Sequence, residues 1–206
     1  MRRWVTAFIL ILAAFSITYS SATFYILSQR PFQPFIAVGV FSPEGALSGY
    51  SSGTVVSITA NKVQNWYLQV TNKMGSVQYV RVAYRLGNAS TQSPTNIQPS
   101  STSCILETVA PYNCLYSDTF ISNGKTANLN FTWTILSENQ TGSVTHLNLL
   151  INGRQFSSPV GAAFGRDFRF IFELWTYDLS SNSFQYGWTG QPSRVGEWLQ
   201  VWFNTY

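Results

Sequence analysis

Charge is what this sequence has least of: only 10% of its 206 residues are Asp, Glu, Lys or Arg, against about 25% in ordinary soluble proteins. Aromatic residues, by contrast, reach 16%. A chain so poor in charge and so rich in aromatic side chains is neither intrinsically disordered nor typical of a cytosolic enzyme. Its length leaves room for one folded domain of ordinary size and little more.

Histidine is scarce as well, because His146 is the only one. A two-histidine zinc or copper site therefore cannot form within one chain. A three-ligand set with His146 would need Cys104 and Cys114, which we expect to form a disulfide instead. The sequence also has no phosphate-binding glycine loop and no paired-glycine nucleotide motif. We expect a protein that is not an enzyme, with no catalytic residue, no metal site and no cofactor.

The formal net charge of +4 does not mark a nucleic-acid partner. Arg2, Arg3 and Arg30 flank the first apolar segment, and from Pro31 onward nine basic residues face eight acidic ones. That part of the chain has no run of basic residues, whereas nucleic-acid binders carry a basic patch or stripe. We therefore expect no nucleic-acid partner.

The first segment of the chain is long and uncharged. It runs from Trp4 to Gln29, 26 residues without an ionisable Asp, Glu, Lys or Arg. A helix of this length crosses a hydrocarbon core of about 30 Å, and two arginines before it against one after it favour a cytoplasmic N-terminus. We expect residues 1–30 to be a transmembrane anchor in the cell membrane and residues 31–206 to be an extracellular domain.

The alternative for this segment is a signal peptide cleaved after Ala22. Arg2-Arg3, a short apolar core and the small residues Ser20-Ser21-Ala22 supply the three parts of such a peptide. The apolar stretch resumes at Phe24-Tyr25-Ile26-Leu27, which favours retention. With either an anchor or a signal peptide, residues 31–206 lie on the extracellular side of the membrane.

Two kinds of residue agree with an extracellular address. Asn88, Asn130 and Asn139 each open an Asn-x-Ser or Asn-x-Thr tripeptide, the acceptor for N-linked glycans. Cys104 and Cys114 are the only cysteines, and an even number in an oxidising compartment predicts a disulfide. In the chain-entropy model such a short bridge stabilises the fold by roughly 3 kcal/mol.

Beyond Pro31 the apolar residues recur with the period of two that is typical of strands. The clearest strand is Ala127–Leu136, in which Phe131 and Trp133 would face the core and Asn130 would face outward. Other segments show the same alternation or a weaker form of it: 35–41, 54–60, 66–71, 79–86, 105–110, 114–121, 168–175 and 198–204. The segment 144–151 is ambiguous between a strand and a helical turn, and we assign it as a strand. About eight or nine short strands separated by turn residues predict an all-β fold, an antiparallel β-sandwich.

Three features between or on these strands are candidates for function or for packing. The uncharged segment Asn88–Ser103 cannot bury a core, so we expect an exposed connection. Glu173 lies within a strong strand, where an ion pair with Arg169 or with a neighbouring strand is favoured over an acid–base role. Seven aromatic residues near the C-terminus would form core or partner contacts, or alternatively a carbohydrate-stacking platform: Trp175, Tyr177, Phe184, Tyr186, Trp188, Trp198 and Trp202.

A strand, a turn and a tyrosine follow one another at 34–50, and four further strand motifs lie at 70–72, 79–82, 170–175 and 198–202. In these short stretches the chain resembles an archaeal family known as domain of unknown function 1616. Ser42 stands where the family usually has Gly, and the connection Asn88–Ser103 looks like an insertion. The resemblance covers about a third of the chain. It implies a membrane-tethered immunoglobulin-like β-sandwich outside an archaeal cell and assigns no catalytic residue.

These expectations combine into a function. The chain would be a non-catalytic, single-pass extracellular glycoprotein that serves as an accessory or structural subunit of a cell-envelope or membrane assembly. Its partners would be membrane lipid, N-linked glycans and other subunits or copies of itself. A first alternative is a secreted subunit of archaeal surface filaments, with the segment from Thr23 to Phe41 as a donated strand. A second alternative is a carbohydrate-binding envelope protein.

Overall fold

The computed structural model describes residues 12–13, 15–21, 23, 25, 33–42, 56–108, 114–190 and 193–205. The chain divides into two units, Met1–Gln33 and Pro34–Tyr206. The described residues between 12 and 25 are helical. Among the residues that the structure describes, no helix is both long enough and apolar enough to cross a membrane. Most of the expected span Trp4–Gln29 lies outside the described residues.

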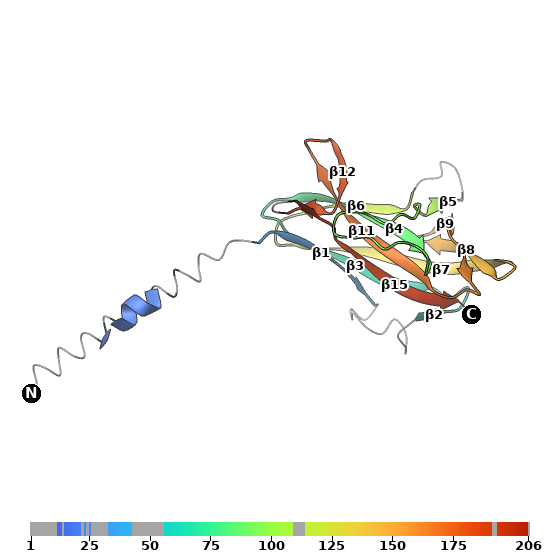
Figure 1. The fold of residues 1–206 in the computed structure, drawn as a ribbon, viewed down its shortest axis with the longest axis horizontal. Helices are drawn as coiled ribbons and strands as arrows, with labels where there is room; N and C mark the ends of the chain where they lie inside the picture. Colours follow the sequence, from blue (N-terminus) through green and yellow to red (C-terminus); the bar gives the residue numbers. More distant parts are fainter. Residues whose placement is uncertain are drawn as a thin grey trace, which may run out of the picture. The chain divides into compact units, whose positions relative to one another are not determined.

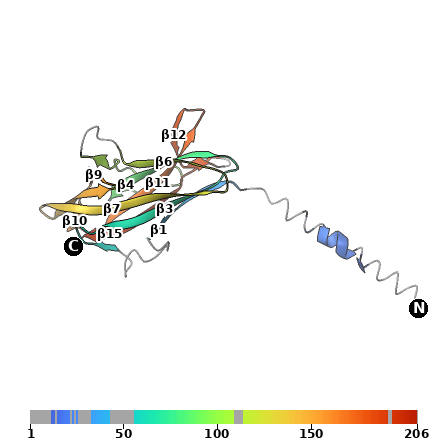
Figure 2. The ribbon, with the colours of Figure 1, turned by 180° about the vertical axis from the view of Figure 1, so that it is seen from behind.

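The second unit contains two large sheets, which Figure 1 shows from one side. The seven-stranded sheet has the order β1-β3-β7-β8-β9-β5, and β10 pairs with β8. In that order its strands are β1 (Phe35–Phe41), β3 (Gln64–Lys73), β7 (Thr126–Thr141), β8 (Val144–Ile151), β9 (Arg154–Ser157), β5 (Leu106–Glu107) and β10 (Ala162–Ala163). Figure 2 shows the molecule from behind, where β7 and β3 run side by side.

The six-stranded sheet has the order β2-β15-β11-β4-β6, and β12 pairs with the end of β11. These strands are β2 (Val56–Ile58), β15 (Trp198–Thr205), β11 (Phe168–Asp178), β4 (Gln78–Gly87), β6 (Tyr116–Ile121) and β12 (Ser183–Tyr186). A short ribbon of β13 (Trp188–Thr189) and β14 (Arg194–Val195) follows β12. In both views the hairpin of β11 and β12 projects from the sandwich.

Aromatic side chains from the two sheets meet in one core. Phe131 of β7 lies 5.1 Å from the ring of Tyr84 of β4 and 5.1 Å from that of Phe170 of β11. Trp133 of β7 lies 5.1 Å from Phe203 of β15. Such ring pairs contribute about 0.5–1.5 kcal/mol each beyond the area they bury. The expected β-sandwich is therefore confirmed, because the inner faces of two sheets pack against each other.

The strand register that alternation predicts is confirmed on β7. Phe131 and Trp133 are buried, with 0% and 1% of their surface exposed, whereas Asn130 is exposed. Thr134 breaks the pattern because it is also buried, and its hydroxyl donates to the Lys62 carbonyl at 3.1 Å. The register shifts just beyond it, between Ile135 and Ser137. A bulge of this kind adds one residue to a strand and cannot be read from alternation.

Two expectations about the sheets were wrong or incomplete. The sandwich is not wholly antiparallel, because β2 pairs with β15 in parallel. These strands lie far apart in sequence, so no hairpin turn forces the antiparallel direction. The strands β9 and β12 were also not predicted from the sequence. Each has only four residues, too few to show the apolar–polar alternation from which strands are predicted.

Candidate functional site

The outer face of the six-stranded sheet carries a cluster of aromatic side chains from four strands. Residues opposite one another on neighbouring strands point to the same face, and here five of the outward positions of β4, β6, β11 and β12 are aromatic. We call this cluster the outer aromatic surface; it consists of Tyr79, Tyr116, Phe120, Tyr177 and Phe184.

The rings of this surface contact one another across the strands. Tyr79 and Phe120 stack with their centroids 4.2 Å apart and their planes 10° apart. Tyr79 also lies 5.0 Å from Phe184, which in turn lies 5.3 Å from Tyr177. The row ends at β6, an edge strand of the sheet, where Phe120 is 70% exposed. One face of the row is therefore available to a ligand or partner.

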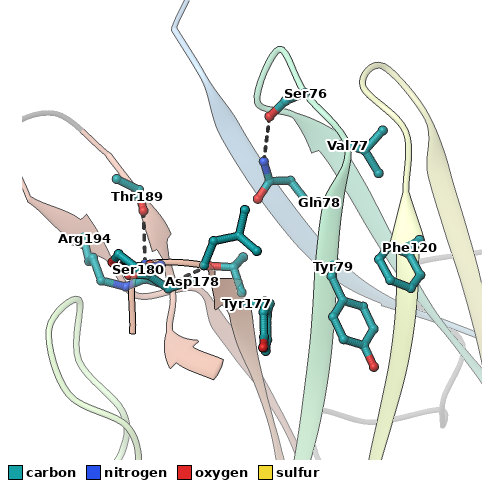
Figure 3. A pocket seen from close by; sticks show the side chains of 12 residues that line it. Ser76, Val77, Gln78, Tyr79, Phe120, Tyr177, Asp178, Ser180, Thr189 and Arg194 are labelled. Atoms are coloured by element: carbon teal, nitrogen blue, oxygen red, sulfur yellow. Dashed lines mark hydrogen bonds between the residues drawn. The ribbon is translucent and has the colours of Figure 1, made fainter. Parts of the chain in front are cut away.

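A cleft of about 910 Å³ opens beside this row of rings. Figure 3 shows Tyr79 and Phe120 side by side on neighbouring strands, with Tyr177 and the polar side chains of Gln78 and Asp178 in the same cleft. The Asp178 carboxylate accepts hydrogen bonds from the Ser180 hydroxyl and amide, which hold the pKa of Asp178 below its ordinary value. The cleft thus combines flat rings with amide and carboxylate groups.

Arg81 joins the polar and aromatic parts of the surface. Its guanidinium donates two hydrogen bonds of 2.8 Å to the Asp118 carboxylate, which raise the pKa of Arg81. The same guanidinium lies 3.7 Å from the ring centroid of Tyr116 and 4.1 Å from that of Phe184. A second hollow of about 500 Å³ adjoins these residues. Arginine between aromatic rings is a composition that is enriched at protein interfaces.

The remaining outer face of β11 is covered by the chain itself. Glu173 is fully buried, and its carboxylate accepts the Ser100 backbone N–H at 2.6 Å and the Arg85 side chain at 3.3 Å. The ion pair with a neighbouring strand is therefore present, but Arg169 is not its partner. The Trp175 ring N–H also donates to it at 3.4 Å. Desolvation alone would be costly for this carboxylate, so the three donors explain how it is accommodated.

Arg169 attaches the same connection at a second point. Its guanidinium donates to the Ser93 hydroxyl at 2.8 Å and to the Thr91 carbonyl, and it lies 4.6 Å from the ring centroid of Trp202. Burial lowers the pKa of Arg169. The segment Asn88–Ser103 is therefore not a simple exposed connection, because charged side chains of β11 bind its backbone and hold it over the sheet. Because the segment Asn88–Ser103 itself has no charged residue, its own sequence does not indicate these contacts.

Arg194 holds the base of the projecting hairpin. Its guanidinium donates to the carbonyls of Gln185, Tyr186 and Gly187, at distances from 2.6 to 3.0 Å. Gly187 has a φ of 72°, a left-handed conformation that favours glycine. A Cβ there would lie 2.1 Å from the Val195 carbonyl oxygen. These contacts position β12, and with it Phe184, against the outer aromatic surface.

The seven aromatic residues singled out from the sequence do not form one platform. Tyr177 and Phe184 belong to the outer aromatic surface, but Trp188 packs against the core and Trp202 lies beneath Arg169. Tyr79, Tyr116 and Phe120 were not among the residues singled out from the sequence. The signal was present, because all three occupy outward positions of predicted strands, but a search along one segment of sequence cannot detect a cluster that spans four strands.

The disulfide is present between Cys104 and Cys114, with Cα atoms 5.4 Å apart. Their sulfurs therefore cannot act as thiolate ligands beside His146. In the part of the chain that the structure describes, no group of three or more His, Cys, Asp or Glu side chains could hold a metal ion.

The three expected glycosylation acceptors differ in their surroundings. Asn130 and Asn139 are exposed on β7. Asn88 is half-buried, and its amide nitrogen, the atom that would carry a glycan, donates to the Gly161 carbonyl at 2.7 Å. Asn130 and Asn139 are thus the more accessible acceptors.

One sequence pattern bears on the expectation that the chain is not an enzyme. Gly49-Tyr50-Ser51-Ser52-Gly53 matches the Gly-x-Ser-x-Gly spacing of a hydrolase nucleophile elbow. It lies outside the described residues, so the structure does not test it.

Comparisons with known proteins assign no family. No family model matches the chain, and no curated protein matches it. Among solved structures the chain is similar to the CARDB domain of the PF1109 protein from Pyrococcus furiosus, which was crystallised in complex with di-metal ions. The match has 11% sequence identity and a TM-score of 0.34, and it covers 84% of this chain and 94% of that one. A likeness at this level transfers neither a ligand nor a function.

Proposed function

We propose that this chain is a non-catalytic, single-pass membrane glycoprotein whose sandwich lies outside the cell and serves as an accessory or structural subunit of a cell-envelope or membrane assembly. The observation that carries the binding role is the outer aromatic surface, where Arg81 lies between Tyr116 and Phe184. The Cys104–Cys114 disulfide supports an oxidising, extracellular compartment. The immunoglobulin-like class and the likeness to the archaeal family 1616 belong to the same proposal.

The anchor is tested with the full-length chain in membranes. We expect the chain to remain in the pellet after carbonate extraction, and its mass to include residues 1–22 and any glycans. Arginine at both Leu12 and Phe15 should release it, because each charge at the centre of a span costs about 2.5–3.5 kcal/mol. Valine and leucine at the same positions are the matched control. A mature chain that begins at Thr23 would contradict the anchor.

The subunit role is tested by the size of the native particle in mild detergent. We expect a particle larger than one chain, and we expect Arg81→Ala to reduce its size by removing the group that joins Tyr116 and Phe184. Asn128→Ala on the other sheet, an exposed position of β7 that opens no glycosylation tripeptide, should leave the size unchanged. An unchanged particle with Arg81→Ala would contradict the role of the outer aromatic surface.

Carbohydrate binding is a second candidate function. It is favoured by one observation, the exposed ring of Phe120 at the end of a stacked row, with Gln78 and Asp178 in the same cleft. Titration of the chain with envelope saccharides, monitored by tryptophan and tyrosine fluorescence, distinguishes it from the first proposal. No observation favours the filament alternative, since Phe35–Phe41 already pairs with β3 of its own chain.

A further inference from the structure

One end of the sandwich carries the start of β1. There Phe35 pairs with Lys73, the last residue of β3, and the turn that follows leads into β4. The β6–β7 turn lies at this end as well, since Ile121 pairs with Gln78. Figure 1 shows the start of β1 and the β11–β12 hairpin at one end and the C-terminus with β2 at the other. We call the first of these the proximal end.

Exposed apolar side chains gather at the proximal end. Val77, Phe120 and Leu179 are 61%, 70% and 88% exposed, and all three line the same cleft. They come from three different elements: the turn before β4, the edge strand β6 and the tip of the β11–β12 hairpin. Isolated exposed apolar residues are common on soluble domains, whereas several around one cleft mark an interaction site.

The length of chain before β1 limits what can cover this end, if the anchor of the proposed function is present. The uncharged segment ends at Gln29 and β1 begins at Phe35. The intervening residues, even fully extended at about 3.3–3.6 Å each, reach roughly 20 Å. The headgroup layer on each side of the hydrocarbon core is itself about 5–8 Å thick. The proximal end is therefore held close to the lipid surface.

The side chains at the proximal end also suit a lipid surface chemically. Tyr79 and Tyr177 line the same cleft as the apolar residues, and tyrosine is enriched at the level of lipid headgroups because its ring is apolar and its hydroxyl polar. Lys73 ends β3 and Lys125 directly precedes β7, both at this end. Two carboxylates lie near these lysines: Asp118 is bound by Arg81, and Asp178 in the cleft interacts with the charge of Arg194. Each therefore has a cation of its own and does not cancel the lysines.

We propose that the proximal end rests on the phospholipid surface outside the membrane, with Val77, Phe120 and Leu179 inserted among the headgroups and Lys73 and Lys125 facing lipid phosphates. This inference rests on the proposed anchor and adds an orientation: the sandwich lies with its β1 end on the bilayer. Arg81, Tyr116 and Phe184 then remain above the lipid, where they can contact neighbouring subunits.

The test uses the full-length chain in vesicles of phosphatidylcholine and phosphatidylglycerol. The native cysteines are joined to each other, so a cysteine introduced at Phe120 or Leu179 can be labelled selectively with a fluorophore. Phe164 is the matched control: it is 67% exposed and lies at the opposite end of the sandwich, where its backbone N–H donates to the Ser143 carbonyl. We expect nitroxide-headgroup lipids to quench roughly half or more of the fluorescence at 120 and 179, as for groups about 5–10 Å into the interface, and almost none at 164.

Each outcome decides the proposal. Quenching at 120 and 179 but not at 164, reduced in vesicles of phosphatidylcholine alone, supports it. Equal quenching at 120 and 164, or quenching at neither in chains that float with the vesicles, overturns the orientation and leaves the anchor standing. Chains that do not float with the vesicles overturn the anchor and this inference together. Protection of the 120 label by a soluble saccharide, without lipid quenching, would assign the cleft to sugar instead.

Discussion

Successive residues of β11 have opposite environments. Phe172 points into the core and stacks edge-on against Tyr84 and Phe131, whereas Glu173 points outward and is bound by Ser100 and Arg85. Both are fully buried. A strand is buried on both faces only where something packs on each side of its sheet. Here the other sheet covers the inner face of β11, and the connection between β4 and β5 covers the outer face. Tyr84 shows the strength of the core burial, which raises its pKa to about 12.

At the same scale, Trp133 and Asn130 test the register of β7. Trp133→Ala should lower the free energy of unfolding by about 3–5 kcal/mol, because it leaves a cavity among the rings of both sheets. Asn130→Gln should remove a glycan and leave the unfolding free energy nearly unchanged, because Asn130 is exposed. Denaturant titration of both variants measures the difference. Equal losses would contradict the assignment of one residue to the core and the other to solvent.

The sequence could predict which residues of the long strands face the core, because a period of two assigns them without further information. It could not predict the partner of Glu173. Arg169 lies on the same face of the same strand, but Arg85 lies on the neighbouring strand, and only the pairing of β4 with β11 places it within reach. Pairings between distant strands are not encoded in local sequence.

At the scale of elements, the segment Asn88–Ser103 depends on β11. Glu173→Ala should remove the hydrogen-bond acceptor of the Ser100 amide and the ion-pair partner of Arg85. We expect faster hydrogen exchange over residues 91–102 and a loss of roughly 3–5 kcal/mol in stability, as when one partner of a buried pair is removed. Glu107→Gln is the control, since its ion pair with Arg154 lies on the other sheet. Unchanged exchange in Glu173→Ala would show that other contacts hold the segment.

Short elements were the least predictable from sequence. The hairpin that carries Phe184 is positioned by Arg194 and by the left-handed Gly187, whose contacts come from residues of β14 and its flanks. The parallel pairing of β2 likewise depends on the distant strand β15. The outer aromatic surface could be predicted only in part for the same reason: each ring occupies a predictable outward position, but their assembly requires the strand order β6-β4-β11-β12.

For the whole sandwich, the question that separates the proposed functions is whether β1 comes from the same chain or from a neighbouring one. β1 is an edge strand of the seven-stranded sheet and pairs with β3 over all seven of its residues. Its core-facing side chains Ile36 and Val40 are buried against the rest of the core. Edge strands can also be supplied by a neighbouring chain, which is how the filament alternative would use this segment.

A pair of cysteines distinguishes a strand of the same chain from a donated one. Ala37 and Thr71 lie opposite each other on β1 and β3, and opposite residues of antiparallel strands have Cα atoms about 4.5–5.5 Å apart, within the range of a disulfide. We expect the variant with Ala37→Cys and Thr71→Cys to form this bond within one chain, so that it migrates as a monomer on a non-reducing gel. Each single variant is the control for adventitious linkage. A ladder of covalent oligomers from the double variant alone would show that β1 is exchanged between chains, and would favour the filament subunit.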